Sequence, residues 1–239
     1  MKTKALLFAA FGCIGFIALL SSCKKNSTKI SHTPSSNLMA FNLAPDQTGV
    51  NFTVGGNSIT SSPLGFRNYT GTYVNVPVGT QDVVSLNAAT NTQLATTSQM
   101  FADSAFYSVF LLGINNNYQD VFVKDDFDSM NLASGLAYIR YVNAITDSSQ
   151  PQQTVNITSG SASIFDTTSA FASVSPFRGV APGNITVNVN SEAGVDTLSK
   201  SLSVTQGNVY TILLAGEPAQ TDTTKSIQAI LIQNGKLNH

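Results

Sequence analysis

The strongest constraint on the fold is an internal repeat with a spacing of about one hundred residues. The stretch VNFTVGGNSI (50–59) returns as VNITSGSASI (155–164) with six identical positions. Three further pairs of blocks follow the same order, namely LMAFNLAP (38–45) with LAYIRYVNA (136–144), YVNVPVGTQDVVSLNA (73–88) with FRGVAPGNITVNVNSE (177–192), and YSVFLLG (107–113) with YTILLAG (210–216). Gapless comparison gives separations of 98, 105, 104 and 103 residues in chain order. Four blocks in register indicate a tandem duplication.

Each copy is predicted to consist of short β-strands. DVVSLN (82–87) and ITVNVN (185–190) alternate apolar and polar residues, which is typical of strands with one buried face. FYSVFLLG (106–113) and VYTILLAG (209–216) are almost continuously apolar, so we expect central strands covered on both faces. Strands are expected near 38–43, 50–54, 57–60, 69–76, 80–87, 92–98, 105–112 and 118–123, and again near 136–143, 154–158, 161–165, 171–179, 184–190, 196–204, 208–215 and 226–232.

The spacing of these strands predicts an all-β fold. Strands about ten residues apart, separated by Gly-rich turns, favour an antiparallel sandwich, and about one hundred residues suffice for its core. The prediction is two tandem, antiparallel, immunoglobulin-like β-sandwich domains that follow a signal peptide and a flexible tether. The expected boundaries are 1–22 for the signal, 23–37 for the tether, 38–124 and 136–239 for the two sandwiches, and 125–135 for a linker.

The N-terminus has the parts of a secretory signal. Lys2 and Lys4 precede an apolar run at 5–20, and LSSC (20–23) follows it. Leu, two small residues and Cys resemble the lipobox of bacterial lipoproteins, which implies cleavage before Cys23 and acylation of that residue, for example with palmitate. The other cysteine, Cys13, lies in the apolar run, so the mature chain would contain no free thiol. The resemblance implies a membrane partner through the lipid, with an outer-membrane location favoured by Lys24 and the leaflet undecided.

A second resemblance concerns the repeated unit itself. LAPDQTGVNFTVGG (43–56), VPVG (76–79) and APG (181–183) resemble the domain of unknown function 4397 (DUF4397) family, in an envelope lipoprotein of Bacteroidetes type. The second copy departs from this pattern, because it has VNAITD (142–147) in place of the APD loop. The resemblance implies a β-sandwich fold and an envelope setting, and it brings no catalytic residues.

The composition argues against several classes of function. Twelve basic and thirteen acidic residues lack the positive patch of a nucleic-acid-binding protein. The two histidines, His32 and His239, lie in the tether and at the last position, where no fold holds them rigidly, so triads with His and His-ligated metal centres are not expected. No cofactor is predicted, and the chain is predicted not to be an enzyme.

A few residues remain as candidates for binding. Tyr69, Tyr73, Tyr118 and Phe127 lie near strand ends or loops and are the candidate aromatic contacts for a ligand such as a glycan. A weak calcium candidate is formed by Asp125, Asp126 and Asp128, although DDFD lacks the spacing of a calcium loop and a solvated linker explains it more simply.

Five Asp-Ser or Asp-Thr steps resemble the O-glycosylation sites of Bacteroidetes envelope proteins. All are expected at turns or termini, and the hypothetical acceptors are Ser104, Ser129, Thr167, Thr197 and Thr223.

The sequence therefore predicts a non-enzymatic envelope lipoprotein that presents two β-sandwich modules for interaction or scaffolding, with envelope proteins or glycans as partners. One alternative is a glycan-binding accessory protein of a polysaccharide-uptake system, and another is a hydrolase that uses paired Asp residues.

Overall fold

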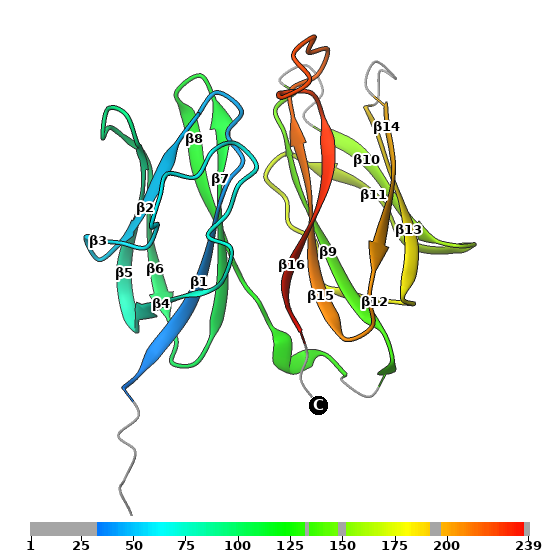
Figure 1. Cartoon of the computed structure of the whole chain (residues 1–239), viewed down its shortest axis with the longest axis horizontal. Helices are drawn as coiled ribbons and strands as arrows, with labels where there is room; N and C mark the ends of the chain where they lie inside the picture. The colour runs from blue at the N-terminus through cyan, green and yellow to red at the C-terminus, as the bar shows by residue number, and fades with distance from the viewer. Residues whose placement is uncertain (1–32, 132–133, 148–151, 192–196, 237–239) are drawn as a thin grey trace, which may run out of the picture. The chain divides into compact units, whose positions relative to one another are not determined.

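Sixteen β-strands form four sheets of four strands in the part of the chain that the computed structural model describes, residues 33–131, 134–147, 152–191 and 197–236 (Figure 1). The all-β prediction is therefore confirmed, as is the arrangement in two successive β-sandwiches. Cys23, His32 and His239 lie outside the described residues.

The first copy contributes eight strands to two sheets. Their bounds are β1 Ser35–Asn42, β2 Val50–Val54, β3 Asn57–Ser58, β4 Val74–Pro77, β5 Gly79–Asn87, β6 Gln93–Phe101, β7 Phe106–Ile114 and β8 Asn117–Lys124. One sheet has the order β4-β1-β7-β8 and the other has the order β3-β2-β5-β6. A short 3₁₀ helix, η1 (Phe127–Ser129), follows β8.

The second copy repeats this plan strand for strand. Its strands are β9 Ala137–Ile145, β10 Gln152–Ser159, β11 Ala162–Ala170, β12 Arg178–Val180, β13 Gly183–Ser191, β14 Thr197–Val204, β15 Asn208–Gly216 and β16 Gln228–Lys236. The sheet orders β12-β9-β15-β16 and β11-β10-β13-β14 match those of the first copy. Two identical topologies in succession are what a duplicated unit produces.

The topology differs from the prediction in two details. The first and second strands of each copy lie in different sheets, whereas those of an immunoglobulin domain share one. In addition, β1 pairs parallel with β7, and β9 pairs parallel with β15. The fourth strand of each copy is shorter than expected. The residues before it form isolated bridges instead of a continuous strand, at Leu64 and Tyr69 in the first copy and at Val174 in the second.

The central strands are buried on both faces, as expected from their apolar runs. In β7, Val109 and Leu111 face the core of the first sandwich, while Phe110 and Leu112 face a separate cluster that also includes Leu213 of β15. We call this cluster the shared core; its fully buried members are Met39, Phe41, Leu43, Phe110, Leu112, Val142, Ala144, Leu213, Ala215 and Ile232. The outer faces of two sheets, one from each copy, therefore pack on each other, and residues 34–239 form one compact unit.

Strand pairing corrects the gapless comparison of the first pair of blocks. Asn42 pairs with Leu111, and Asn143 pairs with Leu214 in the same position of β9. The two asparagines also make equivalent hydrogen bonds, from Nδ2 to the carbonyl oxygens of Leu64 and Ser169, both at 2.9 Å. Asn143 is thus the counterpart of Asn42, three residues later than the gapless comparison implies. Met39 accordingly corresponds to Arg140.

Gly113 at the end of β7 offers a test of the hairpin geometry. Its φ is 115°, and a Cβ placed there would overlap the carbonyl oxygen of Asn117 in the facing strand. We expect Gly113→Ala to lower the free energy of unfolding by more than about 1 kcal/mol. Gly235→Ala in β16 is the control, because a Cβ there meets nothing within 4 Å. Equal unfolding midpoints in urea for the two variants would contradict this account.

Candidate functional site

Polar side chains occupy the centre of the contact between the two sandwiches, beside the shared core. We call this group the Arg140 cluster, and it consists of Tyr73, Ser108, Asp125, Arg140, Thr211 and Asn234. Four strands and the segment before η1 supply most of these residues, so the cluster exists only when both copies are folded and in contact.

Arg140 is the centre of this cluster. Its Nη1 donates to Asp125 Oδ1 at 2.5 Å, and the two side chains are 2% and 0% exposed. Nη2 donates to Ser108 Oγ and Nε to Thr211 Oγ1, both at 2.9 Å. The guanidinium also stacks on Phe177, 4.4 Å from the ring centroid. A fully buried arginine is thus paired with one carboxylate, two hydroxyls and an aromatic face.

The second oxygen of Asp125 is also satisfied. Asp125 Oδ2 accepts hydrogen bonds from Ser108 Oγ at 2.7 Å and from the Tyr73 hydroxyl at 2.5 Å. Burial and the neighbouring Asp125 carboxylate raise the pKa of Tyr73, so its hydroxyl remains a donor at neutral pH. The carboxylate therefore accepts three hydrogen bonds, which compensates for its removal from water.

The cluster is built on a pseudo-twofold relation between the copies. Thr211 occupies in β15 the position that Ser108 has in β7. Ser108 pairs with Val123 and Thr211 pairs with Ile232, so Ile232 corresponds to Val123. Asp125 and Asn234 each follow two residues after these partners and therefore correspond to each other. Across the contact, Asp125 binds Arg140, while the corresponding Asn234 lies 4.0 Å from the sulfur of Met39, the counterpart of Arg140. Reciprocal contacts between corresponding residues define an isologous interface, here within one chain.

This relation provides a matched test of the ion pair. We expect Arg140→Met or Asp125→Asn alone to lower the free energy of unfolding by about 3–5 kcal/mol, because each leaves a buried charge without its partner. The double variant recreates the Met39–Asn234 chemistry on the other side of the pseudo-twofold axis, so it should lose much less than the sum of the two single changes. Urea unfolding of all four proteins gives the coupling energy. Additive losses would contradict this reading.

Aromatic rings cover one side of the Arg140 cluster. Tyr73 packs edge-on against Phe106 and Phe127, with centroid distances of 5.1 and 5.9 Å, and Phe127 lies 6.3 Å from Phe177. Edge-to-face contacts at these distances are favourable. Two of the four aromatic residues that the sequence nominated for ligand binding, Tyr73 and Phe127, are thus brought together, and both contribute to packing.

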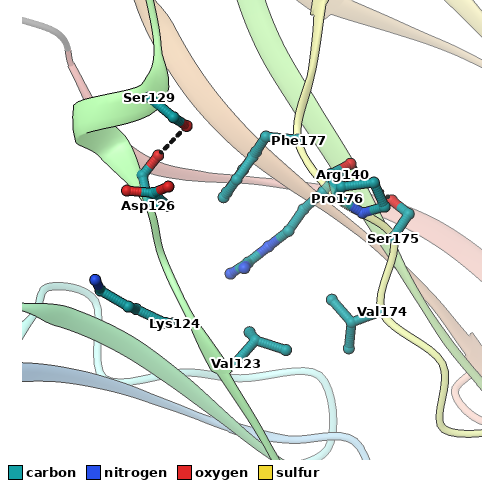
Figure 2. Close-up of a pocket in the computed structure, with 9 residues that line it drawn as sticks. All are labelled: Val123, Lys124, Asp126, Ser129, Arg140, Val174, Ser175, Pro176 and Phe177. Atoms are coloured by element: carbon teal, nitrogen blue, oxygen red, sulfur yellow. Dashed lines mark hydrogen bonds between the residues drawn. The ribbon is translucent and has the colours of Figure 1, made fainter.

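A cavity of about 450 Å³ adjoins the Arg140 guanidinium (Figure 2). Lys124, Asp126 and Ser129 come from the end of β8 and η1, and Ser129 Oγ donates to the carbonyl oxygen of Asp126 at 2.8 Å. The remaining lining residues are Val123, Arg140, Val174, Ser175, Pro176 and Phe177. Each nitrogen of the Arg140 guanidinium already has a protein partner, and the cavity lining mixes polar and apolar side chains.

The other two nominated aromatic residues lie apart. Tyr69 stacks on Phe41 of the shared core, with ring centroids 5.4 Å apart. The Tyr118 hydroxyl donates to Asp46 Oδ2 at 2.6 Å and accepts from Gln47 Nε2 at 2.5 Å. Burial raises the pKa of Tyr118, and the hydrogen bond to Asp46 raises it further by a smaller amount. The four residues do not form a common surface.

The structure separates the environments of the three residues in the calcium candidate. Asp125 is buried against Arg140, whereas Asp126 and Asp128 lie on the exposed side of the segment. Among the described residues, no group of three or more His, Cys, Asp or Glu side chains is placed to hold a metal ion. The alternative, a solvated linker, does not describe Asp125, because this residue is buried in an ion pair with Arg140 of the second copy.

Asp120, in β8, is half-buried, and its Oδ2 atom is shielded from water. Its Oδ1 accepts a hydrogen bond from Ser85 Oγ at 2.6 Å, and its Oδ2 has no hydrogen-bond partner in the described part of the chain. Burial raises the pKa of Asp120 to about 6, and the Ser85 hydrogen bond opposes this rise. Because the folded chain holds this proton more tightly than the unfolded chain, Asp120 stabilises the fold less as the pH rises from about 4 to 6.

We therefore expect Asp120→Asn to raise the melting temperature at pH 7–8, and this gain should shrink toward pH 4. The amide needs no charge in the buried position, so the variant avoids the cost of desolvating a carboxylate. Asp82→Asn, at an exposed position on β5, is the control for loss of one negative charge. A pH-independent difference between Asp120→Asn and the wild-type chain would refute the proposed titration.

The hypothetical glycosylation acceptors are all exposed. Ser104 lies in a turn with a φ of 59°, Ser129 ends η1, and Thr223 lies in the β15–β16 connection. Thr197 begins β14. Thr167, however, lies inside β11 instead of at a turn.

Four members of the Arg140 cluster were not nominated from the sequence: Ser108, Arg140, Thr211 and Asn234. One signal was present, because Arg140 is the single charged residue in AYIRYVNAI, a mostly apolar strand that is buried throughout its centre. A charge inside such a run requires a buried partner. The sequence does not say which of thirteen acidic residues supplies it.

These features define a tandem β-sandwich protein whose two copies are joined by a buried ion pair. A family model, the domain of unknown function DUF4397, matches residues 36–150. This range contains the first sandwich except for Ser35, the first residue of β1, and it also contains β9; it confirms the family resemblance for these residues. None of the curated proteins matches the chain.

Two solved structures are similar over most of the chain. Each is described as a "putative cell adhesion protein", one from Bacteroides ovatus and one from Bacteroides uniformis. The first is 9% identical, with 87% of this chain and 99% of the other covered and a TM-score of 0.27. The second is 10% identical, with 84% and 97% covered and a TM-score of 0.23. Scores this low support no conclusion about this chain.

Proposed function

We propose that this protein is a non-enzymatic, lipid-anchored protein of the cell envelope that presents two β-sandwiches for interaction or scaffolding. Cys23 carries the lipid, and the outer membrane is the proposed location. The first strand begins at Ser35, so eleven residues separate it from Cys23. A chain of that length spans at most about 40 Å, which keeps the sandwiches close to the membrane.

The observation that carries this proposal is that three charged side chains, Arg140, Asp125 and the half-buried Arg67, are used to join the two copies. Arg140 and Asp125 are satisfied by each other and by neighbouring hydroxyls. Arg67, in the crossing segment of the first copy, donates to the backbone carbonyls of Ala215, Thr224 and Ser226 in the second. Such groups hold the sandwiches together, and they are not directed at a substrate.

The remaining parts of the proposal concern layout and modification. We assign residues 1–22 to the signal, 23–37 to the tether, 38–124 and 136–239 to the sandwiches, and 125–135 to the linker. Among the described residues, no helix is long and apolar enough to cross a membrane. The acceptors proposed for O-glycosylation are Ser104, Ser129, Thr167, Thr197 and Thr223, whose exposure is compatible with modification.

Lipidation is tested by expressing the full chain in bacteria supplied with an alkyne analogue of palmitate. We expect the label to attach to the wild-type protein and to Cys13→Ser, since Cys13 would be removed with the signal. Cys23→Ser should lose both the label and the membrane association, because a multiply acylated cysteine is a durable anchor.

Intact-mass measurement of the native protein is the second readout. It should show a start at Cys23, the lipid mass and any added glycan. A label that survives Cys23→Ser would overturn the anchor, and a mass that contains only polypeptide and lipid would remove the glycosylation sites.

A further inference from the structure

Strand β6 forms an open edge of the first sandwich. It is the last strand in the sheet order β3-β2-β5-β6 and extends over nine residues, QLATTSQMF, without a charged residue or proline. The free backbone groups of an edge strand can pair with another strand, and proteins usually block such edges with charges, proline or short length.

Other edges in the described part of the chain carry such protection. Strands β3, β4 and β12 have only two, four and three residues. The longer edge strands, β8, β11, β14 and β16, each contain at least one charged residue. These residues are Asp120 and Lys124 in β8, Asp166 in β11, Lys200 in β14 and Lys236 in β16. Among the long described edges, only β6 has no such feature.

Comparison with the corresponding strand of the second copy sharpens the contrast. Val83 pairs with Thr97 of β6, and its counterpart Val187 pairs with Lys200 of β14. Paired residues share a face of a sheet, and both valines are fully buried, so Thr97 and Lys200 sit on the inner face of their edge strands. An inward-pointing charge on an edge strand blocks pairing. The second copy has this block, and the first has threonine instead.

The outer face of β6 is also suited to contact. Thr96, Ser98 and Met100 are exposed, and Met100, at 63%, is the most exposed large hydrophobic residue in the described part of the chain. Side chains of this kind contribute hydrogen bonds and apolar area when a strand is added beside them.

We propose that β6 pairs antiparallel with β6 of a second copy of this chain. A register centred on Thr97 places Thr96 opposite Ser98 of the second copy, a favourable pair, with no charge at any position. The same self-pairing of β11, centred on its middle residue, would oppose Asp166 to itself. A single strand pair buries less than a standard interface of about 1,600 Å², so the dimer is weak and forms where the protein is concentrated.

Disulfide trapping tests this pairing in the membrane of cells that express the full chain. The only cysteines are Cys13 and Cys23, so a new cysteine is readily followed. Antiparallel partners have Cβ atoms about 4.5–5.5 Å apart, and small adjustments bring two cysteines within bonding distance. We expect Thr97→Cys to yield a disulfide-linked dimer on mild oxidation, whereas Ser201→Cys in β14, which keeps the blocking Lys200, should remain monomeric.

A charge variant gives the complementary measurement. Sedimentation velocity of the detergent-solubilised chain should show a concentration-dependent dimer that Thr97→Lys abolishes and Ser203→Lys, on β14, leaves unchanged. If Thr97→Lys fails to fold, the trapping experiment decides. Equal trapping at residues 97 and 201, capture of a different protein through Thr97→Cys, or a monomer at all concentrations would overturn the proposal. The sedimentation result does not depend on the lipid anchor or on the proposed function.

Discussion

The structure depends on the burial of two apolar sheet faces against each other. Strands β1 and β7 of the first copy, and β9 and β15 of the second, are covered by their own sandwich on one side and by the shared core on the other. Phe41 and Phe110 stack within this core, with centroids 4.7 Å apart. Exposing such a face to water would cost roughly 25 cal/mol for each Å² of apolar area, so the sandwiches stay together.

Within that apolar contact, the Arg140 cluster specifies how the two sheets are placed relative to each other. Apolar packing alone is tolerant of sliding, whereas a buried guanidinium with three hydrogen-bonded partners is satisfied in one arrangement. The pseudo-twofold relation shows where the copies diverged. One side of the axis has Met39 and Asn234, and the other has Arg140 and Asp125. Arg67 also lacks an equivalent cation in the second copy. The corresponding residue there, which has the same left-handed backbone conformation, is Ala172.

The contact also leaves one sheet of each copy outside the shared core. The two inner sheets are used for cohesion, while the outer sheets, with orders β3-β2-β5-β6 and β11-β10-β13-β14, remain available to partners. Their edges differ because Lys200 occupies in β14 the position that Thr97 has in β6. Two copies of one fold can therefore have different roles, one as an open edge and the other as a protected one.

Local sequence patterns determined the strands, the duplication and the double burial of FYSVFLLG and VYTILLAG, because alternation and apolar runs reflect which faces are buried. The same patterns could not place Asp125, which lies in a polar segment and whose partner Arg140 is fifteen residues away. They also nominated Tyr73 and Phe127 as exposed contacts, although both pack beside the cluster. Only the tertiary structure decided these points, because a buried charge is placed by the partner that neutralises it, and that partner comes from the other copy.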